Sequence, residues 1–226
     1  MGTGVILLSG GLDSAVSAYI ARDDMGKRAN LYGITIDYGQ THLKEIDCAV
    51  ELGKSLDLLN HFFPVADLHG ISKSALTGEG EIRQTGEAKD IPTTWVPQRN
   101  SIFLAMAFAL AETVNADKIY TGFNQMDYSG YPDCRQVYVD QMARALNLAS
   151  KRFVETGRGF GLITPIINKK KFEVVQIGTK LEVPFVSTWS CYMGGEKACG
   201  KCDSCRIRLE AFEKTGMTDP IEYERS

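Results

Sequence analysis

Four cysteines near the C-terminal end of the sequence have the residue type and spacing of a metal site. The spacing is C-x7-C-x2-C-x2-C within 15 residues, formed by Cys191, Cys199, Cys202 and Cys205. Proteins hold structural zinc with such a closed set of four thiolates. Iron–sulfur clusters use similar spacing, but their common signature ends C-x3-C-P, whereas this one ends C-x2-C-R. The pattern favours structural zinc over an iron–sulfur cluster or a catalytic metal.

The two remaining cysteines stand apart from this group. Cys48 lies in a stretch of helical composition, where we expect it to be part of the core. Cys134 lies in a predicted loop, where a reactive thiol competes with a buried and inert one, the more common case. Disulfides are not expected, because a cytosolic environment keeps thiols reduced.

A second candidate site is a loop rich in glycine and serine that follows the first apolar run, with the sequence Ser-Gly-Gly-Leu-Asp-Ser. Gly10 and Gly11 let the backbone turn sharply and approach phosphate oxygens, and the serine hydroxyls can donate hydrogen bonds to them. Asp13 can hold a Mg²⁺ ion that offsets the phosphate charge. The loop matches neither G-x-x-x-x-G-K-[ST] nor G-x-G-x-x-G. A tight turn capped by Ser or Asp would use similar residues, but the complete hexapeptide favours ATP binding. The predicted ATP-binding residues, called the glycine loop below, are Leu8, Ser9, Gly10, Gly11, Leu12, Asp13 and Ser14.

Alternating apolar runs and helical stripes predict the elements that would position this loop. Strands are expected over residues 5–8, 31–36, 61–65, 118–123 and 162–167, and helices over 12–22, 42–58, 100–113, 136–149 and 170–181. This alternation predicts an α/β fold with an open parallel sheet and helices on both faces, in which ligands bind at the carboxyl ends of strands. The polar stretch over residues 69–91 is typical of a mobile loop or lid rather than of core.

The bulk composition limits the classes of function. A length of 226 residues with 44% hydrophobic and 23% charged residues fits one globular domain over residues 1–226, with residues 186–226 as a zinc-binding appendage. No apolar run reaches the roughly 18 residues of a membrane span, and no secretory-type basic segment precedes the first apolar run, so we expect a cytoplasmic protein. The formal charge of −3 argues against a polynucleotide partner.

Five motifs in order resemble the 7-cyano-7-deazaguanine synthases, a family of PP-loop ATP pyrophosphatases with a Rossmann-like fold. Besides the glycine loop and the cysteine cluster with Thr-Trp-Ser-Cys-Tyr at residues 188–192, they are Asp-Tyr-Gly-Gln at 37–40, Val-Pro-Gln-Arg-Asn at 96–100, and the tyrosine- and aspartate-rich segment 122–135. The resemblance runs from the first strand to about Phe212. This sequence departs from the family pattern at two places. Thr41 stands where the family usually has arginine, and Asn168-Lys169 stands where apolar or hydroxyl residues are expected. Both departures concern the details of substrate binding and not the use of ATP.

This resemblance implies an enzyme that converts 7-carboxy-7-deazaguanine, ammonia and ATP into the nitrile. It also implies Mg²⁺ for ATP, Zn²⁺ for the fold, and a homodimer. A carboxylate is a poor electrophile, so transfer of AMP to it would create the leaving group that ammonia displaces. Asp13 is expected to act through Mg²⁺, and the cations Arg99 and Lys171 are expected to stabilise charge that builds near the α-phosphate.

The segment after the fourth predicted strand is expected to recognise the flat base. Its aspartates can accept from ring N–H and amine groups, and its tyrosines, with Trp95, can stack. A polar turn whose aromatics pack on the core explains the same residues equally well. The predicted substrate-binding residues are Gln40, Asn124, Asp127, Tyr128, Tyr131 and Asp133.

Three other functions compete with this interpretation. A PP-loop enzyme acting on tRNA is disfavoured by the acidic balance and by the lack of both a basic appended domain and a convincing catalytic cysteine pair. An adenylating enzyme that passes the activated carboxylate to a protein amine remains open, because the acceptor site has no sequence motif. A zinc adaptor without enzymatic activity is disfavoured by the intact glycine loop.

Overall fold

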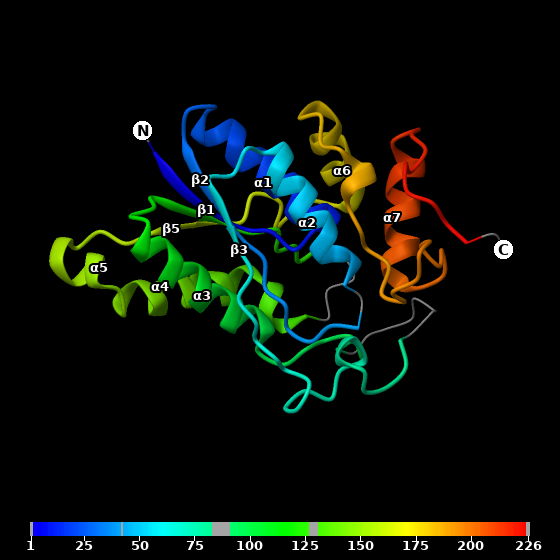
Figure 1. Cartoon of the computed structure of the whole chain (residues 1–226), viewed down its shortest axis with the longest axis horizontal. Coiled ribbons are helices and arrows are strands. Elements are labelled where there is room, and N and C mark those ends of the chain that lie inside the picture. The colour runs from blue at the N-terminus through cyan, green and yellow to red at the C-terminus, as the bar shows by residue number, and fades with distance from the viewer. Residues whose placement is uncertain (1, 42, 83–90, 127–130, 225–226) are drawn as a thin grey trace.

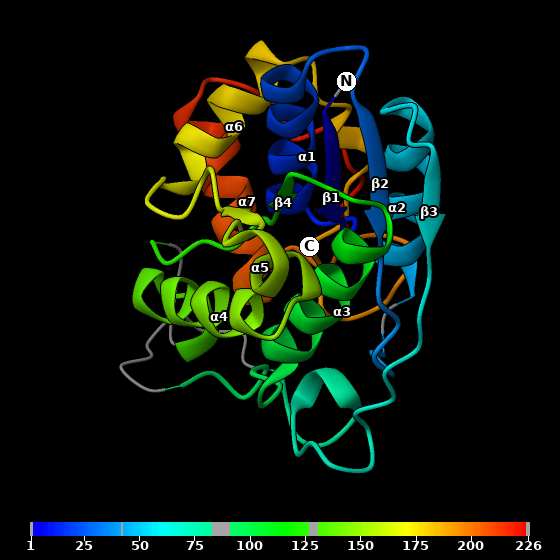
Figure 2. The ribbon, with the colours of Figure 1, turned by 90° about the vertical axis from the view of Figure 1, so that its left-hand side faces the viewer.

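The computed structural model contains a parallel α/β sheet, as predicted (Figure 1). It describes residues 2–41, 43–82, 91–126 and 131–224. Within these residues the sheet has five strands, β1 (Thr3–Leu7), β2 (Asn30–Ile34), β3 (Asn60–Phe62), β4 (Lys118–Tyr120) and β5 (Gly161–Ile163). The strand order is β3-β2-β1-β4-β5 and all four pairings are parallel. Figure 2 shows β3 at one edge of the sheet, beside a helix.

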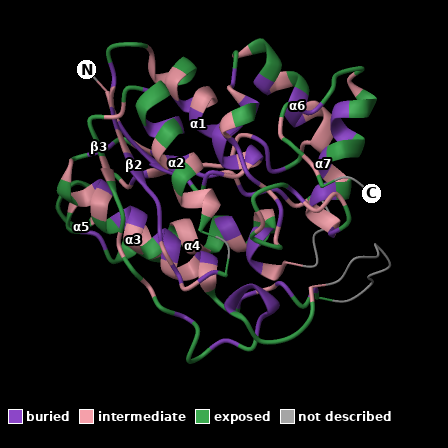
Figure 3. Cartoon of the chain, turned by 45° about the vertical axis from the view of Figure 1, so that its right-hand side comes forward, coloured by how far each residue is buried: buried purple, intermediate pink, exposed green. Residues whose placement is uncertain are grey.

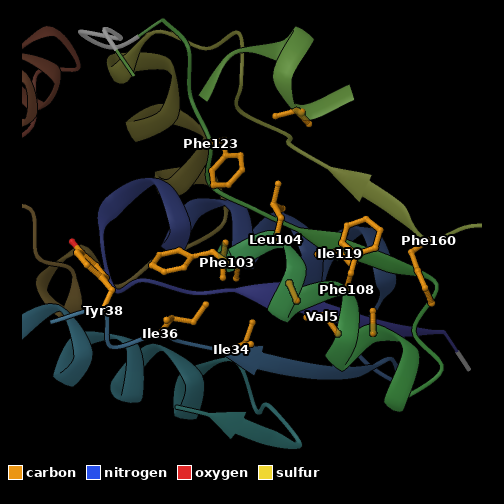
Figure 4. Close-up of a cluster of buried hydrophobic side chains, with 14 of the residues drawn as sticks. Val5, Ile34, Ile36, Tyr38, Phe103, Leu104, Phe108, Ile119, Phe123 and Phe160 are labelled. Carbon is orange, nitrogen blue, oxygen red and sulfur yellow. The ribbon is translucent and has the colours of Figure 1, made fainter. Parts of the chain in front are cut away.

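Side chains along β1 alternate between the two faces of the sheet and so seed two hydrophobic cores. Val5 and Leu7 belong to the core that includes Phe103 and Leu104, drawn in Figure 4. Ile6 and its counterparts on the other face belong to a second core. The first face of the sheet is covered by the helices α3 (Arg99–Thr113), α4 (Gln136–Leu148) and the short α5 (Lys151–Thr156). The second face is covered by the helices α1 (Leu12–Met25), α2 (Lys44–Ser55), α6 (Lys171–Lys180) and α7 (Asp203–Lys214). The prediction of helices on both faces is confirmed.

The cysteine region follows α6 and packs on the second face. Phe212 of α7 stacks edge-on against Phe185 at 5.2 Å between ring centroids, and both residues belong to the second core. Arg208 of α7 forms a buried ion pair with Asp219, with Nε 2.6 Å from Oδ2. Because breaking such a pair leaves an uncompensated buried charge, this contact holds the C-terminal segment on α7. Figure 3 shows that exposed residues lie mainly on the outward sides of the helices and in loops.

The structure corrects the sequence prediction in three places. Residues 75–77 of the expected lid form a 3₁₀ turn, η1 (Ala75–Thr77), which is buried and adds Leu76 to the first core. The turn is stable because the Ser74 side chain accepts a hydrogen bond from the Leu76 amide. Strands β3, β4 and β5 are shorter than predicted, and α5 and α7 were not predicted. The remaining 3₁₀ turns are η2 (Pro132–Cys134) and η3 (Phe185–Ser187). None of the described helices combines the length and the apolar character needed to cross a membrane.

Candidate functional site

The glycine loop joins β1 to α1 and is held by its own hydroxyl groups. The Ser14 hydroxyl accepts from the Ser9 amide at 3.2 Å and from the Ser9 hydroxyl at 3.0 Å, and it donates to the Gly11 carbonyl at 2.9 Å. Gly10 has a φ of +90°, and a Cβ there would lie 1.9 Å from the Glu45 carbonyl oxygen. Only glycine therefore fits, and the turn delivers the chain to the N-terminus of α1, where free N–H groups favour anions.

The loop after β4 lies directly against the glycine loop. A Cβ on Gly122 would lie 2.6 Å from the Ser14 amide nitrogen, so the two backbones touch. Because β2 and β4 flank β1 on opposite sides, the chain leaves this point in opposite directions. In open parallel sheets this reversal of strand order opens the crevice in which ligands bind.

Two of the three predicted catalytic residues meet at this crevice. The Lys171 ammonium, at the start of α6, lies 2.7 and 2.6 Å from the two carboxylate oxygens of Asp13. The N-cap of α1 is Gly11, and no side chain caps the helix. The capping role that competed with magnesium binding for Asp13 is therefore not found.

A cavity of about 290 Å³ connects these groups with the other predicted site residues. All of the glycine loop except Gly10 lines it. From other elements it is lined by Lys171, Arg99 and three of the predicted substrate-binding residues, Gln40, Asn124 and Tyr131. Asp127 and Tyr128 lie outside the described residues.

The predicted substrate-binding residues differ in how their polar groups are engaged. Gln40 accepts from the Tyr38 amide at 2.9 Å, and Asn124 donates to the Lys169 carbonyl at 2.8 Å. The Tyr131 hydroxyl bonds to Thr94 at 2.7 Å. Asp133 is buried and does not line the cavity; its Oδ2 accepts from the Asn100 amide at 3.3 Å, which satisfies a free donor at the start of α3.

Aromatic side chains that sequence reasoning did not assign to the site form part of the cavity wall. Tyr38 and Phe103 lie 5.6 Å apart between ring centroids, and Tyr192 and Trp189 also line the cavity. Burial raises the pKa of Tyr38 to about 12, so its hydroxyl stays protonated at neutral pH. The Asp-Tyr-Gly-Gln and Thr-Trp-Ser-Cys-Tyr motifs contained the signal for three of these rings. Phe103 gave no signal beyond an apolar helix position.

Cys134 also lines the cavity, where it accepts a hydrogen bond from the Asn100 side chain at 3.4 Å. Burial raises the pKa of this thiol to about 12. A protonated thiol is a weak nucleophile, so the environment favours the inert interpretation of Cys134.

The four clustered cysteines converge as the sequence predicted. Their sulfur atoms all lie within 4.8 Å of one another, and Cys199 and Cys205 are 3.9 Å apart. Four sulfurs at about 2.3 Å from a tetrahedral zinc ion would be about 3.8 Å apart, so the set fits. The Cys199 amide donates to Cys191 Sγ at 3.3 Å. Hydrogen bonds to its sulfur lower the pKa of Cys191, and the one from the Cys202 thiol has the largest effect.

The parallel sheet, the glycine loop at its point of reversal and the Asp–Lys pair beside it define a PP-loop protein. A family model described as "Queuosine biosynthesis protein QueC" matches residues 3–216, and the chain belongs to this family. Three similar proteins carry the name 7-cyano-7-deazaguanine synthase. The protein of Trichodesmium erythraeum is 44% identical, covering 96% of this chain and 98% of that protein. Those of Thermoplasma volcanium and Oceanobacillus iheyensis are both 42% identical, covering 98% and 97% of this chain and 90% and 97% of theirs.

Proposed function

We propose that this protein converts 7-carboxy-7-deazaguanine, ammonia and ATP into 7-cyano-7-deazaguanine, in the cytoplasm, as a step of queuosine biosynthesis. The observation that carries the proposal is that one and the same cavity is lined by the glycine loop and by a wall of aromatic rings. Such a cavity allows a nucleotide phosphate and a planar heterocycle to meet. The names of the similar proteins support the same reaction.

The phosphates of ATP would lie on the glycine loop at the N-terminus of α1, where backbone N–H groups favour anions. Asp13 would hold a Mg²⁺ ion, which offsets phosphate charge when bound. Lys171 forms an ion pair with Asp13. If Asp13 held this ion, the Lys171 ammonium would be placed to donate to a phosphate oxygen and to stabilise the charge that builds there.

The reaction then follows from the substrate's need for a leaving group. A carboxylate oxygen attacks the α-phosphorus of ATP and expels pyrophosphate, which gives an acyl-adenylate. Ammonia attacks the acyl carbon, AMP departs, and loss of a proton gives the primary amide. The amide oxygen attacks the α-phosphorus of a second ATP and expels pyrophosphate. Departure of AMP and loss of both protons from the amide nitrogen then give the nitrile.

The cysteine cluster would hold zinc for a structural purpose, because its four thiolates leave no open position for substrate. The homodimer is expected from the family resemblance alone. Light scattering of the purified protein would measure it directly.

The test is product identification by mass spectrometry after incubation with the carboxylate, ammonium, ATP and Mg²⁺. We expect the nitrile, and no nitrile when ammonium is omitted. Accumulation of the amide alone, or a mass increase on a protein instead of a free nitrile, would contradict the proposal. The second of these outcomes would support the enzyme that passes the carboxylate to a protein amine.

A further inference from the structure

Arg99 is a partly buried cation that forms no ion pair with any acid in the described part of the chain. It is the first residue of α3, and its guanidinium carbon lies 5.3 Å from the ring centroid of Tyr38 and 5.9 Å from that of Phe103. Figure 4 shows these two rings next to each other at one end of the first core. The Arg99 Nε is buried and has no hydrogen-bond partner, and NH1 makes one long bond of 3.4 Å to the Tyr38 hydroxyl.

No carboxylate in the described part of the chain forms an ion pair with Arg99. Asp133, a buried acid near this end of α3, acts on Arg99 electrostatically without forming an ion pair, and its Oδ2 accepts a hydrogen bond from the Asn100 amide. Taking a lone charge out of water is unfavourable unless an opposite charge compensates. Since Arg99 lines the cavity, a ligand anion is the compensating group that this arrangement lacks.

Two anions are available in the proposed reaction, the nucleotide phosphate and the carboxylate of the heterocyclic acid. The phosphate has its own cation, since Lys171 lies beside the glycine loop. Arg99 comes from α3, on the opposite face of the sheet from α1 and α6, and its neighbours are aromatic rings that suit a flat heterocycle. A planar guanidinium binds a planar carboxylate through two parallel hydrogen bonds.

Resting on the proposed function, we propose that Arg99 binds the carboxylate of the heteroaromatic acid and determines the specificity of the first half-reaction. This assigns Arg99 to the acid rather than to the α-phosphate, where sequence analysis had placed it. The two assignments differ in their consequences. The first half-reaction acts on a carboxylate anion, whereas the second acts on a neutral amide. A carboxylate-binding residue matters chiefly for the first, and a residue at the α-phosphate matters equally for both.

The test compares Arg99→Met, Arg99→Lys and wild type, with the acid and the primary amide supplied separately as substrates. Loss of charged hydrogen bonds should raise the KM for the acid about 10- to 100-fold in Arg99→Met. The KM values for the amide and for ATP should change less than about threefold, and Arg99→Lys should recover part of the loss. Binding of the acid without ATP, measured by calorimetry, should weaken in parallel.

Two controls make the outcome decisive. Lys171→Met should slow both half-reactions to a similar extent. The melting temperature of Arg99→Met should equal or exceed that of wild type, because a partly buried charge without an ion-pair partner among the described residues is being removed. Equal losses with the acid and the amide, or a raised KM for ATP, would overturn the assignment of Arg99. Failure of the wild-type protein to use either substrate would instead overturn the proposed function.

Discussion

The carboxylate of Asp13 accepts from the Lys171 ammonium and does not cap α1. Asp13→Asn keeps the shape of the side chain but removes the charge that would hold Mg²⁺. We expect turnover to fall by orders of magnitude, while the melting temperature changes little. Turnover and thermal unfolding of the same preparation measure both. Asp23→Asn, at an exposed position of the same helix, is the matched control and should behave like wild type. An Asp13→Asn protein with normal turnover would refute the magnesium role.

His61 gives the fold a dependence on pH that has its origin in burial. Its ring packs over Gly33 and Gly53, where an added Cβ would lie 2.9 and 2.7 Å from ring atoms, and Nε2 lies 2.6 Å from the Thr35 hydroxyl oxygen. Burial lowers the pKa of His61 to about 4. The ordinary value is about 6.5, so the unfolded chain binds the proton first as the pH falls.

The neutral ring therefore contributes its full stability above about pH 6.5, and this contribution is lost as the pH falls toward 4. We expect the melting temperature of wild type to decrease through this window more steeply than that of His61→Phe, which cannot titrate. His69→Gln, at an exposed site, should keep the wild-type slope. Parallel slopes for wild type and His61→Phe would show that protonation of His61 is not coupled to folding.

At the scale of elements, the segment between η3 and the cysteine cluster joins the metal site to the glycine loop. The Trp189 amide donates to the Gly10 carbonyl at 3.0 Å, and its indole Nε1 donates to the Cys191 carbonyl at 2.9 Å. The Lys44 ammonium lies 4.0 Å from the Trp189 ring centroid and also bonds to the Glu196 carbonyl. A displacement of the cysteine cluster would therefore shift the backbone at Gly10 through Trp189.

Cys199→Ser tests the structural role of the cluster. Zinc binding free energy is largely folding free energy, so we expect loss of metal, a lower melting temperature and aggregation, more than a catalytic defect in a well-folded protein. Elemental analysis and thermal unfolding measure these effects. Cys48→Ala removes a partly buried cysteine outside the four and should retain one zinc per chain. Iron with labile sulfide, or a folded and active protein without metal, would exclude the zinc assignment.

The elements also show what the sequence could and could not predict. The apolar run at residues 5–8 predicts a buried strand because both faces of a parallel sheet are covered, and β1 confirms this. The glycine loop and the cysteine cluster were predictable because each is a local pattern with one mechanism. Strands β4 and β5 are three residues long each, too short for the periodicity of the sequence to define their ends. The meeting of Arg99 with Tyr38 was not predictable, since it depends on how α3 packs beside the segment after β2.

At the scale of the whole molecule, the proposed function requires one cavity to bind two chemically different compounds, the acid and the amide intermediate. Its lining contains a single glycine loop, followed by α1, together with Lys171. The acid and the amide intermediate would therefore be activated at the same loop, one after the other. The acid carries a carboxylate charge that the amide intermediate lacks, so under the proposed function a cation and neutral, protonated groups such as the Tyr38 hydroxyl in one cavity wall suit both.

The stoichiometry of nucleotide use follows from this arrangement. Two oxygen atoms must leave a carboxylate before it becomes a nitrile, and each departure requires its own activation. The chain has no kinase-type phosphate loop, and burial keeps the Cys134 thiol protonated, so thioester formation is not favoured. We expect two AMP and two pyrophosphate for each nitrile, with the primary amide released in small amounts and accepted as a substrate. When the amide is supplied, one AMP per nitrile should form. Without ammonia, the reaction should stop at the acyl-adenylate, which remains bound or hydrolyses slowly.

Chromatographic quantification of AMP, ADP and nitrile in the same reaction tests this stoichiometry, with Asp13→Asn as the control for background ATP hydrolysis. ADP and phosphate as products would exclude adenylation, and one AMP per molecule of acid consumed, with the amide as the end point, would show that the second activation does not occur.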